Sequence, residues 1–280
     1  MKKRKRAIVK TTINKAKLKH HKTKSKTKKL KRKKTIKKYP SLNSKKIERV
    51  HSGIPNFDNL IESGFKKNST NIVVGNAGSG KTIFATQFLM EGLKKGESCL
   101  YVTFEEKKDQ FYKDMSRFGW NLEEYEKKGK FNFLEYTPAK VKTMLEEGGG
   151  EVENLILTNK VTRMVIDSIT SFDLLFKDEL ERREAALELF NMLKGWECTV
   201  IITLEDDPSS KESAAHSIEF ETDSIILLYF VRKKNERERF IEILKMRGTK
   251  HSKKVYEFLI EKSGLTIKKT PSRNPPSTEK

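Results

Sequence analysis

The stretch Gly75-Asn76-Ala77-Gly78-Ser79-Gly80-Lys81-Thr82 decides the fold of this chain. It fits the pattern G-x-x-x-x-G-K-[ST], in which glycines let backbone N–H groups approach the phosphates of a nucleotide. The apolar run 71–74 before it is typical of a buried strand, and residues 82–90 after it are typical of a helix. A chance glycine loop is the alternative, and this strand–loop–helix context disfavours it.

The predicted nucleotide-binding residues run from Gly75 to Ile83, with ATP and Mg²⁺ as the predicted cofactors. The helix N-terminus adds a partial positive charge and free N–H donors. Lys81 is expected to reach the β- and γ-phosphates. Thr82 is expected to place its hydroxyl on Mg²⁺.

The positive charge of the chain is concentrated at its N-terminus. Lys and Arg number 22 in residues 1–47, and no Asp or Glu precedes Glu48. The net charge of +21 therefore belongs to this segment, because the rest of the chain holds 37 basic and 38 acidic residues. A segment this poor in apolar residues is predicted to be a disordered tail. It favours non-specific nucleic-acid binding through phosphates, or equally a solvated tail without a partner.

Cysteine usage and hydropathy narrow the class of protein. Cys99 and Cys198 stand singly in apolar runs without a C-x-x-C partner, which is typical of reduced core residues in a cytoplasmic protein. No apolar run reaches the roughly 18 residues of a membrane helix, so no membrane span is predicted. The basic N-terminus lacks the apolar core of a secretory signal.

The rest of the chain alternates strand-like and helix-like segments. A short helix is expected to end at Gly64, capped by Ser52 or Asn56. The expected strands are 71–74, 99–104, 131–134, 164–167, 198–204 and 223–231, with helices at about 83–90, 107–118, 155–159 and 178–194 and an antiparallel pair at 240–246 and 255–260. This predicts an α/β domain over 48–267, a mostly parallel sheet flanked by helices, with a C-terminal antiparallel extension. Residues 268–280 are predicted to be a disordered tail.

Carboxylates follow two of the predicted strands. Asp167 ends an apolar strand, where it can hold a Mg²⁺-bound water beside Thr82; the alternative is an Asp that caps the next turn. Glu105 and Glu106 end another strand and can orient the water that attacks a γ-phosphate. Since adjacent residues of an extended chain point in opposite directions, one of the pair is expected to face that water. The alternative is two solvated charges at a helix start.

Five further segments occur in a fixed order around this loop. They are Gly53-Ile54-Pro55 with Asp58, Thr103-Phe104-Glu105-Glu106, Phe118-Gly119-Trp120, Val165-Ile166-Asp167-Ser168, and Leu244-Lys245-Met246-Arg247-Gly248-Thr249-Lys250-His251-Ser252. With the phosphate loop, they resemble the KaiC-like branch of the RecA-type ATPases over residues 52–267.

This resemblance implies a RecA-like core with Glu105 and Glu106 as its catalytic pair. It implies that the segment Lys245-Met246-Arg247 reaches the nucleotide of a neighbouring subunit, with Thr249 and His251 close by, in a homo-oligomer that is most often a hexamer. Taken alone, Lys245 and Arg247 are two cations at i and i+2 that share a strand face, and an exposed basic strand edge is the alternative.

These observations predict a ring-forming Mg²⁺-dependent ATPase with a regulatory or mechanical role and a protein partner of unknown identity. The alternative is an ATP-dependent scaffold or switch with little turnover. Either can associate with nucleic acid through residues 1–47.

Overall fold

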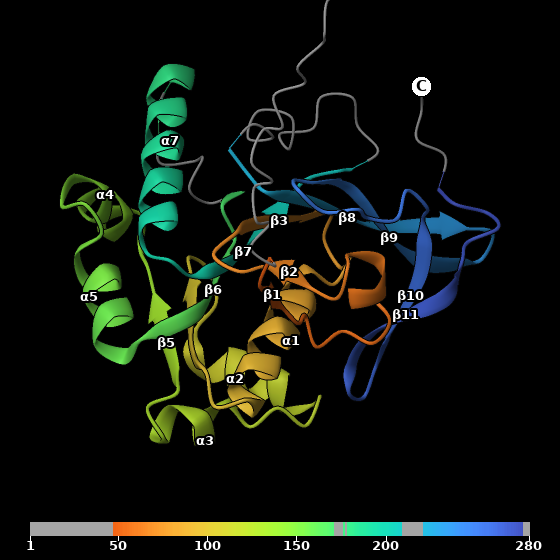
Figure 1. Ribbon diagram of the computed structural model, residues 1–280, viewed down its shortest axis with the longest axis horizontal. Coiled ribbons are helices and arrows are strands. Elements are labelled where there is room, and N and C mark those ends of the chain that lie inside the picture. The colour runs from red at the N-terminus through yellow and green to blue at the C-terminus, as the bar shows by residue number, and fades with distance from the viewer. Residues whose placement is uncertain (1–46, 171–175, 177, 209–220, 277–280) are drawn as a thin grey trace, which may run out of the picture. The chain divides into compact units, whose positions relative to one another are not determined.

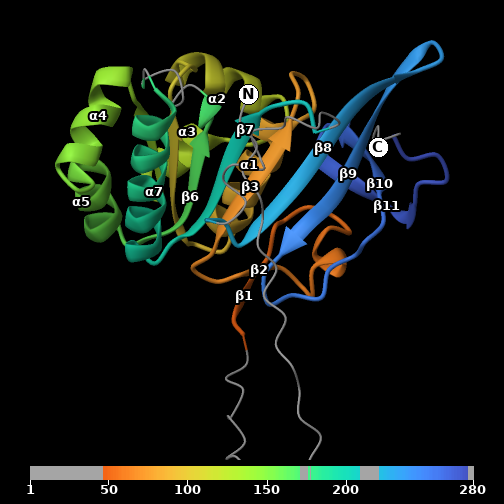
Figure 2. The same ribbon diagram turned by 90° about the horizontal axis from the view of Figure 1, so that it is seen from above.

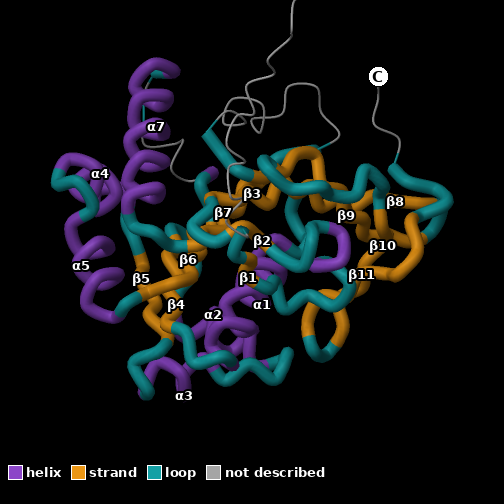
Figure 3. Tube along the Cα trace, in the orientation of Figure 1, coloured by secondary structure: helices purple, strands orange, loops and turns teal. Residues whose placement is uncertain are grey.

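The computed structural model describes residues 47–170, 176, 178–208 and 221–276, whose helices and strands are shown in Figure 3. All but one residue of the predicted basic tail lie outside this part. The elements are β1 (Arg49–Val50), η1 (Asp58–Leu60), β2 (Phe65–Lys66), β3 (Thr70–Gly75), α1 (Lys81–Lys94), β4 (Ser98–Thr103), α2 (Lys108–Ser116), α3 (Leu122–Lys127), β5 (Phe131–Glu135), α4 (Pro138–Glu146), α5 (Gly150–Asn159), β6 (Val161–Asp167), α7 (Glu179–Gly195), β7 (Thr199–Glu205), β8 (Ser224–Lys233), β9 (Glu236–Met246), β10 (Tyr256–Glu261) and β11 (Gly264–Pro271).

A nine-stranded sheet runs through the described residues in the order β11-β10-β9-β8-β3-β7-β6-β4-β5 (Figure 1). The strands from β8 to β5 pair in parallel, whereas β9, β10 and β11 each pair antiparallel with their neighbours. The predicted fold class, a mostly parallel sheet with a C-terminal antiparallel extension, is confirmed.

Helices cover both faces of this sheet (Figures 1 and 2). On one face, Val73 of β3 packs in a core cluster with Phe84 of α1, and α2 and α3 join the same cluster. On the other face, Ile72 and Val74 pack in a second cluster with Phe190 of α7, beside α4 and α5. Because strands of a parallel sheet are buried on both sides, they read as continuous apolar runs, which is why the sequence located them.

Helix α7 shows how local sequence sets an element boundary. Asp178 lies at its N-cap and accepts a hydrogen bond from the backbone N–H of Glu181 at 2.8 Å. Acidic residues occupy its first turn and Lys194 its last, which suits the helix dipole. The predicted helix 178–194 therefore matches α7 within one residue at each end.

The C-terminal boundary differs from the expectation. Residues 268–271, placed in a disordered tail from the sequence, continue β11, which pairs with β10. Only the first half of this edge strand carries buried apolar residues, Leu265 and Ile267. Lys268 and Lys269 are exposed on the outer half, as is common on sheet edges, and this polar composition concealed the strand.

Some short elements also differ from the expectation. The helix expected to end at Gly64 is the short 3-10 helix η1, which ends at Leu60 and has no side-chain cap. Helices α3 and α4 were not predicted, although Thr137 caps α4 ahead of a proline at its first turn. Helix α5 begins at Gly150, earlier than expected.

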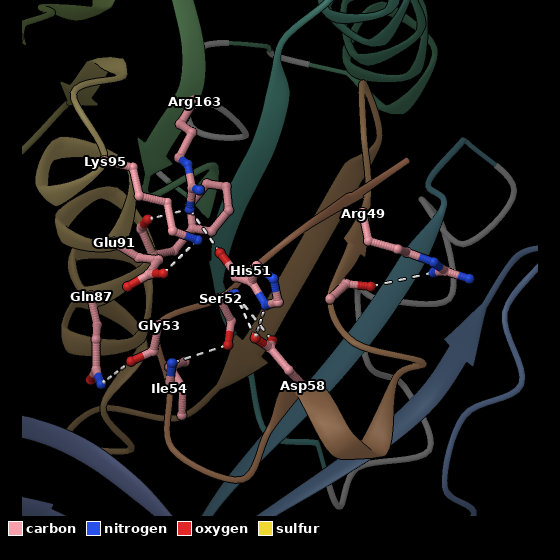
Figure 4. A network of polar contacts seen from close by, with 12 residues as sticks. Arg49, His51, Ser52, Gly53, Ile54, Asp58, Gln87, Glu91, Lys95 and Arg163 are labelled. Atoms are coloured by element: carbon pink, nitrogen blue, oxygen red, sulfur yellow. Dashed lines mark hydrogen bonds and ion pairs between the residues drawn. The ribbon is translucent and has the colours of Figure 1, made fainter. Parts of the chain in front are cut away.

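A polar network fixes the segment that leads into the sheet (Figure 4). The Asp58 carboxylate accepts from the backbone N–H of Ser52 at 3.1 Å and lies 3.0 Å from Nδ1 of His51. Gly53 has φ +73°, and a Cβ there would lie 2.6 Å from Cβ of Glu91 on α1. Gln87 of α1 donates to the Gly53 carbonyl at 2.9 Å. Gly53 and Asp58, which belong to the first of the segments that resemble the family, therefore have a structural role.

Arg163 joins this segment to α1 and β6 (Figure 4). Its guanidinium, 2% exposed, donates to both carboxylate oxygens of Glu97 at 2.8 Å. It also donates to the carbonyls of His51 and Phe88 at 2.8 and 2.9 Å. Gly92 leaves room for it, since a Cβ there would lie 2.5 Å from Nε of Arg163.

The two cysteines are buried and unpaired, as expected of core residues. Burial raises the pKa of Cys198 to about 12 and that of Cys99 further. No helix in the described part of the chain is both long enough and apolar enough to cross a membrane.

Candidate nucleotide-binding site

The phosphate loop joins the central strand β3 to the N-terminus of α1. Gly75 ends β3, and a Cβ there would lie 2.4 Å from Oγ of Ser79 and 2.6 Å from the carbonyl oxygen of Leu228. Gly78 and Gly80 have φ of +76° and +103°. Side chains other than hydrogen are strained at such angles, so the loop geometry requires glycine at these positions.

Lys81 is buried beside the loop, with its side chain 9% exposed. Its ammonium donates to the carbonyls of Gly75 at 2.8 Å and Asn76 at 3.2 Å, and lies 3.5 Å from a carboxylate oxygen of Glu205. The cation is therefore held over the loop by oxygen ligands that phosphate oxygens can replace.

Asp167, at the end of β6, accepts hydrogen bonds from three hydroxyl groups. Thr82 of α1 and Tyr101 of β4 donate to Oδ2 at 2.8 and 2.6 Å, and Thr203 of β7 donates to Oδ1. Burial and the Asp167 carboxylate raise the pKa of Tyr101 well above its ordinary value, so its phenol stays protonated and acts as a donor. The structure thus brings Thr82 and Asp167 into direct contact.

The oxygen ligands at this point fit Mg²⁺. Magnesium is usually held by one or two protein oxygens together with substrate phosphates and waters, and the hydroxyl of Thr82 with the carboxylate of Asp167 supplies such oxygens. Among the described residues no cluster of three or more His, Cys, Asp or Glu could hold a metal by itself.

The glutamate pair follows β4 at the same edge of the sheet. The hydroxyl of Thr103 accepts the backbone N–H groups of Glu105 at 3.3 Å and Glu106 at 3.1 Å, which fixes the turn. Glu105 is exposed, whereas Oε2 of Glu106 is buried without a hydrogen-bond partner in the described part of the chain. Burial, followed by the charge of Asp167, raises the pKa of Glu106.

One cavity of about 430 Å³ joins these groups. It is lined by Ala77, Gly78, Gly80, Lys81, Thr82, Ile83, Thr103, Glu105, Glu106, Asp167, Ser168, Glu205, Arg239 and Ile260. The structure therefore gathers the phosphate loop, both glutamates and Asp167 around one space, and their roles in binding and catalysis stay predictions.

Arg239 is a cavity residue that the sequence reasoning missed. Its Nε and Nη2 donate to the carbonyl of Gly78 at 3.1 and 3.0 Å, and its guanidinium lies 4.2 Å from the ring centroid of Phe230. Burial lowers the pKa of Arg239. The pairing of Phe230 with Arg239 between β8 and β9 brings this cation to the loop, and no local pattern indicated that register.

Lys245 and Arg247 lie near the start of β3 and β8, at the end of the central strands opposite to the phosphate loop. Lys245 donates to the carbonyl of Thr222 at 3.0 Å, and the N–H of Arg247 donates to the carbonyl of Asp223 at 2.7 Å. Asp223 in turn bonds Thr70, where β3 begins. At about 3.3 Å per residue, the five residues from there to Gly75 span roughly 16 Å, more than an arginine side chain can bridge.

Thr249 and His251 are not among the described residues that line the cavity at the phosphate loop of their own chain. Strand β9 ends at Met246, and Arg247 lies in the turn that follows. The expectation that Lys245 and Arg247 share a strand face is therefore wrong. Arg49 of β1 donates to the hydroxyl of Thr249 at 2.7 Å, and Nδ1 of His251 lies 3.0 Å from the carbonyl oxygen of Ser252.

Residues 50–272 match the family model of the KaiC ATPase. The chain belongs to the KaiC family. The solved structure of a KaiC-like protein from Pyrococcus horikoshii aligns with a TM-score of 0.72 and 36% identity, over 80% of this chain and 100% of that one. The fold is therefore that of a KaiC-like, RecA-like ATPase domain, and it has the nucleotide-binding loop of that family.

Relatives of two lengths match this domain. A UPF0273 protein of Thermotoga maritima is 30% identical over 79% of this chain and 96% of its own length. The circadian clock protein KaiC3 of Synechocystis is 33% identical over 79% of this chain, but over only 46% of its own length. The circadian clock oscillator protein KaiC of Thermostichus vulcanus is 31% identical over 80% and 45%. The chain thus spans about half the length of the clock proteins it matches.

Proposed function

We propose that this chain is a Mg²⁺-dependent ATP hydrolase whose active sites are completed between subunits of a homo-oligomeric ring. The observation that carries the proposal is the meeting of the phosphate loop, Asp167 and Glu106 around one cavity, with Oε2 of Glu106 unpartnered among the described residues. This combination supports hydrolysis as well as binding, because it supplies phosphate ligands, metal ligands and a base.

Nucleotide binding rests on Lys81 and the loop that precedes it. The ammonium of Lys81 exchanges the carbonyls of Gly75 and Asn76 for the β- and γ-phosphate oxygens of ATP. The N–H groups at the start of α1 contribute further donors. Arg239, which donates two hydrogen bonds to the carbonyl of Gly78, stiffens the loop.

Thr82 and Asp167 would hold Mg²⁺, which would neutralise charge on the phosphates during transfer. Thr82 would offer its hydroxyl oxygen to the metal, and Asp167 would accept a hydrogen bond from a water on the metal.

Glu106 orients the attacking water and accepts its proton, and Glu105 plays the lesser part. Glu106 is half-buried, and its Oε2 has no hydrogen-bond partner among the described residues, an arrangement that weakens a fold and is found where chemistry needs it. This loss of stability weighs against the alternative of an ATP-dependent scaffold with little turnover, since a protein that only binds ATP gains nothing from burying Oε2 of Glu106 without a partner in the described part of the chain.

The position of Lys245 and Arg247 supports a site shared between subunits. Both lie at the end of the central strands opposite to the phosphate loop of their own chain. They therefore act on the nucleotide of a neighbouring subunit, where Arg247 stabilises charge on the γ-phosphate. Met246, Thr249 and His251 contribute to the same interface. A hexamer is the ring that the family resemblance implies.

ATP binding and hydrolysis would change the conformation of the ring. The cellular role is therefore regulatory or mechanical and involves a protein partner of unknown identity. The basic segment 1–47 holds the complex near nucleic acid through non-specific phosphate contacts. The two unpaired cysteines suit a cytoplasmic location.

The proposal is tested by phosphate release from ATP, measured with and without Mg²⁺, together with light scattering of the eluted protein. We expect hydrolysis to require Mg²⁺ and the molar mass to increase when MgATP is added. A nucleotide-bound protein that releases no phosphate under any metal condition would favour the scaffold instead.

A further inference from the structure

Asp167 accepts hydrogen bonds from more groups than Thr82, the partner that its place at the end of β6 predicts. A carboxylate offers about four lone-pair positions to donors. Thr82 and Tyr101 occupy two on Oδ2, and Thr203 occupies one on Oδ1. One position, on Oδ1, is left without a donor among the described residues.

Tyr101 is brought to this carboxylate by strand register. It pairs with Val165 on the neighbouring strand β6, two residues before Asp167 on the same face. The phenol therefore reaches diagonally across the two strands, and its oxygen lies 2.6 Å from Oδ2. Tyr101 belongs neither to the phosphate loop nor to the segments that carry the family resemblance.

The ring of Tyr101 is locked by its neighbours. It is 0% exposed, lies 4.3 Å from the ring centroid of Phe111, and stacks on Phe133 with an interplanar angle of 4° and a centroid distance of 5.5 Å. A rigid ring delivers its hydroxyl to one place only, which is what a group that orients a metal ligand must do.

We infer that Tyr101 is a positioning residue for the magnesium site. Its hydroxyl fixes the Asp167 carboxylate so that one acceptor position remains for a water on the metal. The inference rests on the proposed function. Removing a group that orients a metal ligand typically lowers the affinity for the metal by about 10- to 100-fold.

The variant Tyr101→Phe removes only the donor and retains the ring that packs on Phe111 and Phe133. Tyr229→Phe is a matched control, since Tyr229 is a buried phenol that donates to another carboxylate, that of Glu242, at 2.9 Å. Tyr229 does not line the nucleotide cavity.

The experiment titrates Mg²⁺ into the full-length protein saturated with ADP, by calorimetry, so that no turnover is needed. We expect Tyr101→Phe to weaken the Mg²⁺ affinity at least about tenfold, in line with the effect of losing such a group. Binding of ADP measured in EDTA should stay unchanged, and Tyr229→Phe should match the wild type in both titrations.

A double-mutant cycle with Asp167→Asn separates orientation from packing. If Tyr101 acts through the carboxylate, Tyr101→Phe adds no further loss in the Asp167→Asn protein. Wild-type Mg²⁺ affinity in Tyr101→Phe, an equal loss in Tyr229→Phe, or a Tyr101→Phe protein that does not fold would each overturn the inference. A wild-type protein that binds ADP with no response to Mg²⁺ would instead contradict the proposed function itself.

Discussion

Replacing Glu106 by glutamine tests whether this chain carries a catalytic base. The amide keeps the size of the side chain but cannot accept a proton. Because a positioned general base contributes about 10²–10⁴-fold, we expect kcat to fall roughly 10³-fold, or about 4 kcal/mol in the barrier. ATP affinity should change little, because Lys81 and the loop remain. The matched variant is Glu105→Gln, whose side chain is exposed and whose loss should cost less than about tenfold.

The assay is phosphate release at saturating MgATP, with nucleotide affinity measured separately. The reasoning is refuted if Glu106→Gln turns over at the wild-type rate, or if Glu105→Gln alone loses as much activity as Glu106→Gln. In the first case the carboxylate of Glu106 has no part in hydrolysis, and the scaffold alternative gains support.

The raised pKa of Glu106 adds a second readout of the same variant. A carboxyl whose pKa is raised by folding binds its proton more tightly in the folded state, so stability falls as pH rises through that pKa. Near neutral pH, Glu106→Gln should therefore unfold at a higher temperature than the wild type. This difference should shrink as the pH is lowered toward the ordinary value for glutamate, about 4.3.

Further variants test the loop, the core and the tail. Lys81→Ala should weaken ATP binding by about 10- to 150-fold, because it removes a charged hydrogen-bond donor to the phosphates. Unchanged ATP affinity in calorimetry would contradict the assignment of the phosphate loop. Gly92→Ala should lower the free energy of unfolding by about 1–3 kcal/mol in a denaturant titration because its methyl group meets Arg163, whereas Gly195→Ala, with open space around it, should not. Deletion of residues 1–47 should leave hydrolysis intact and abolish salt-sensitive DNA retention, and persistent retention would place that site in the domain.

The sequence predicted those parts of the site that depend on local order. The loop from Gly75 to Thr82 is contiguous, and Asp167 follows a strand that is apolar because both faces are covered. The parallel sheet then places these segments at one edge, since carboxyl ends of parallel strands share it.

What the sequence could not predict depends on contacts across strands. Tyr101 and Arg239 reach the site through the register of β4 with β6 and of β8 with β9. The difference between Glu105 and Glu106 is one of burial, which two adjacent identical residues do not reveal. Lys268 and Lys269 concealed an edge strand because both faces of its outer half are exposed.

A mixing experiment tests the shared active site most directly. Arg247→Ala subunits retain a complete phosphate loop and Lys81→Ala subunits retain Arg247, so each protein should be inactive alone. We expect mixtures to regain part of the phosphate release, at interfaces where a Lys81→Ala subunit supplies Arg247 to an Arg247→Ala neighbour. If subunits are shown to exchange and no mixing ratio restores hydrolysis, Arg247 does not act on a neighbour's nucleotide and the shared site is wrong.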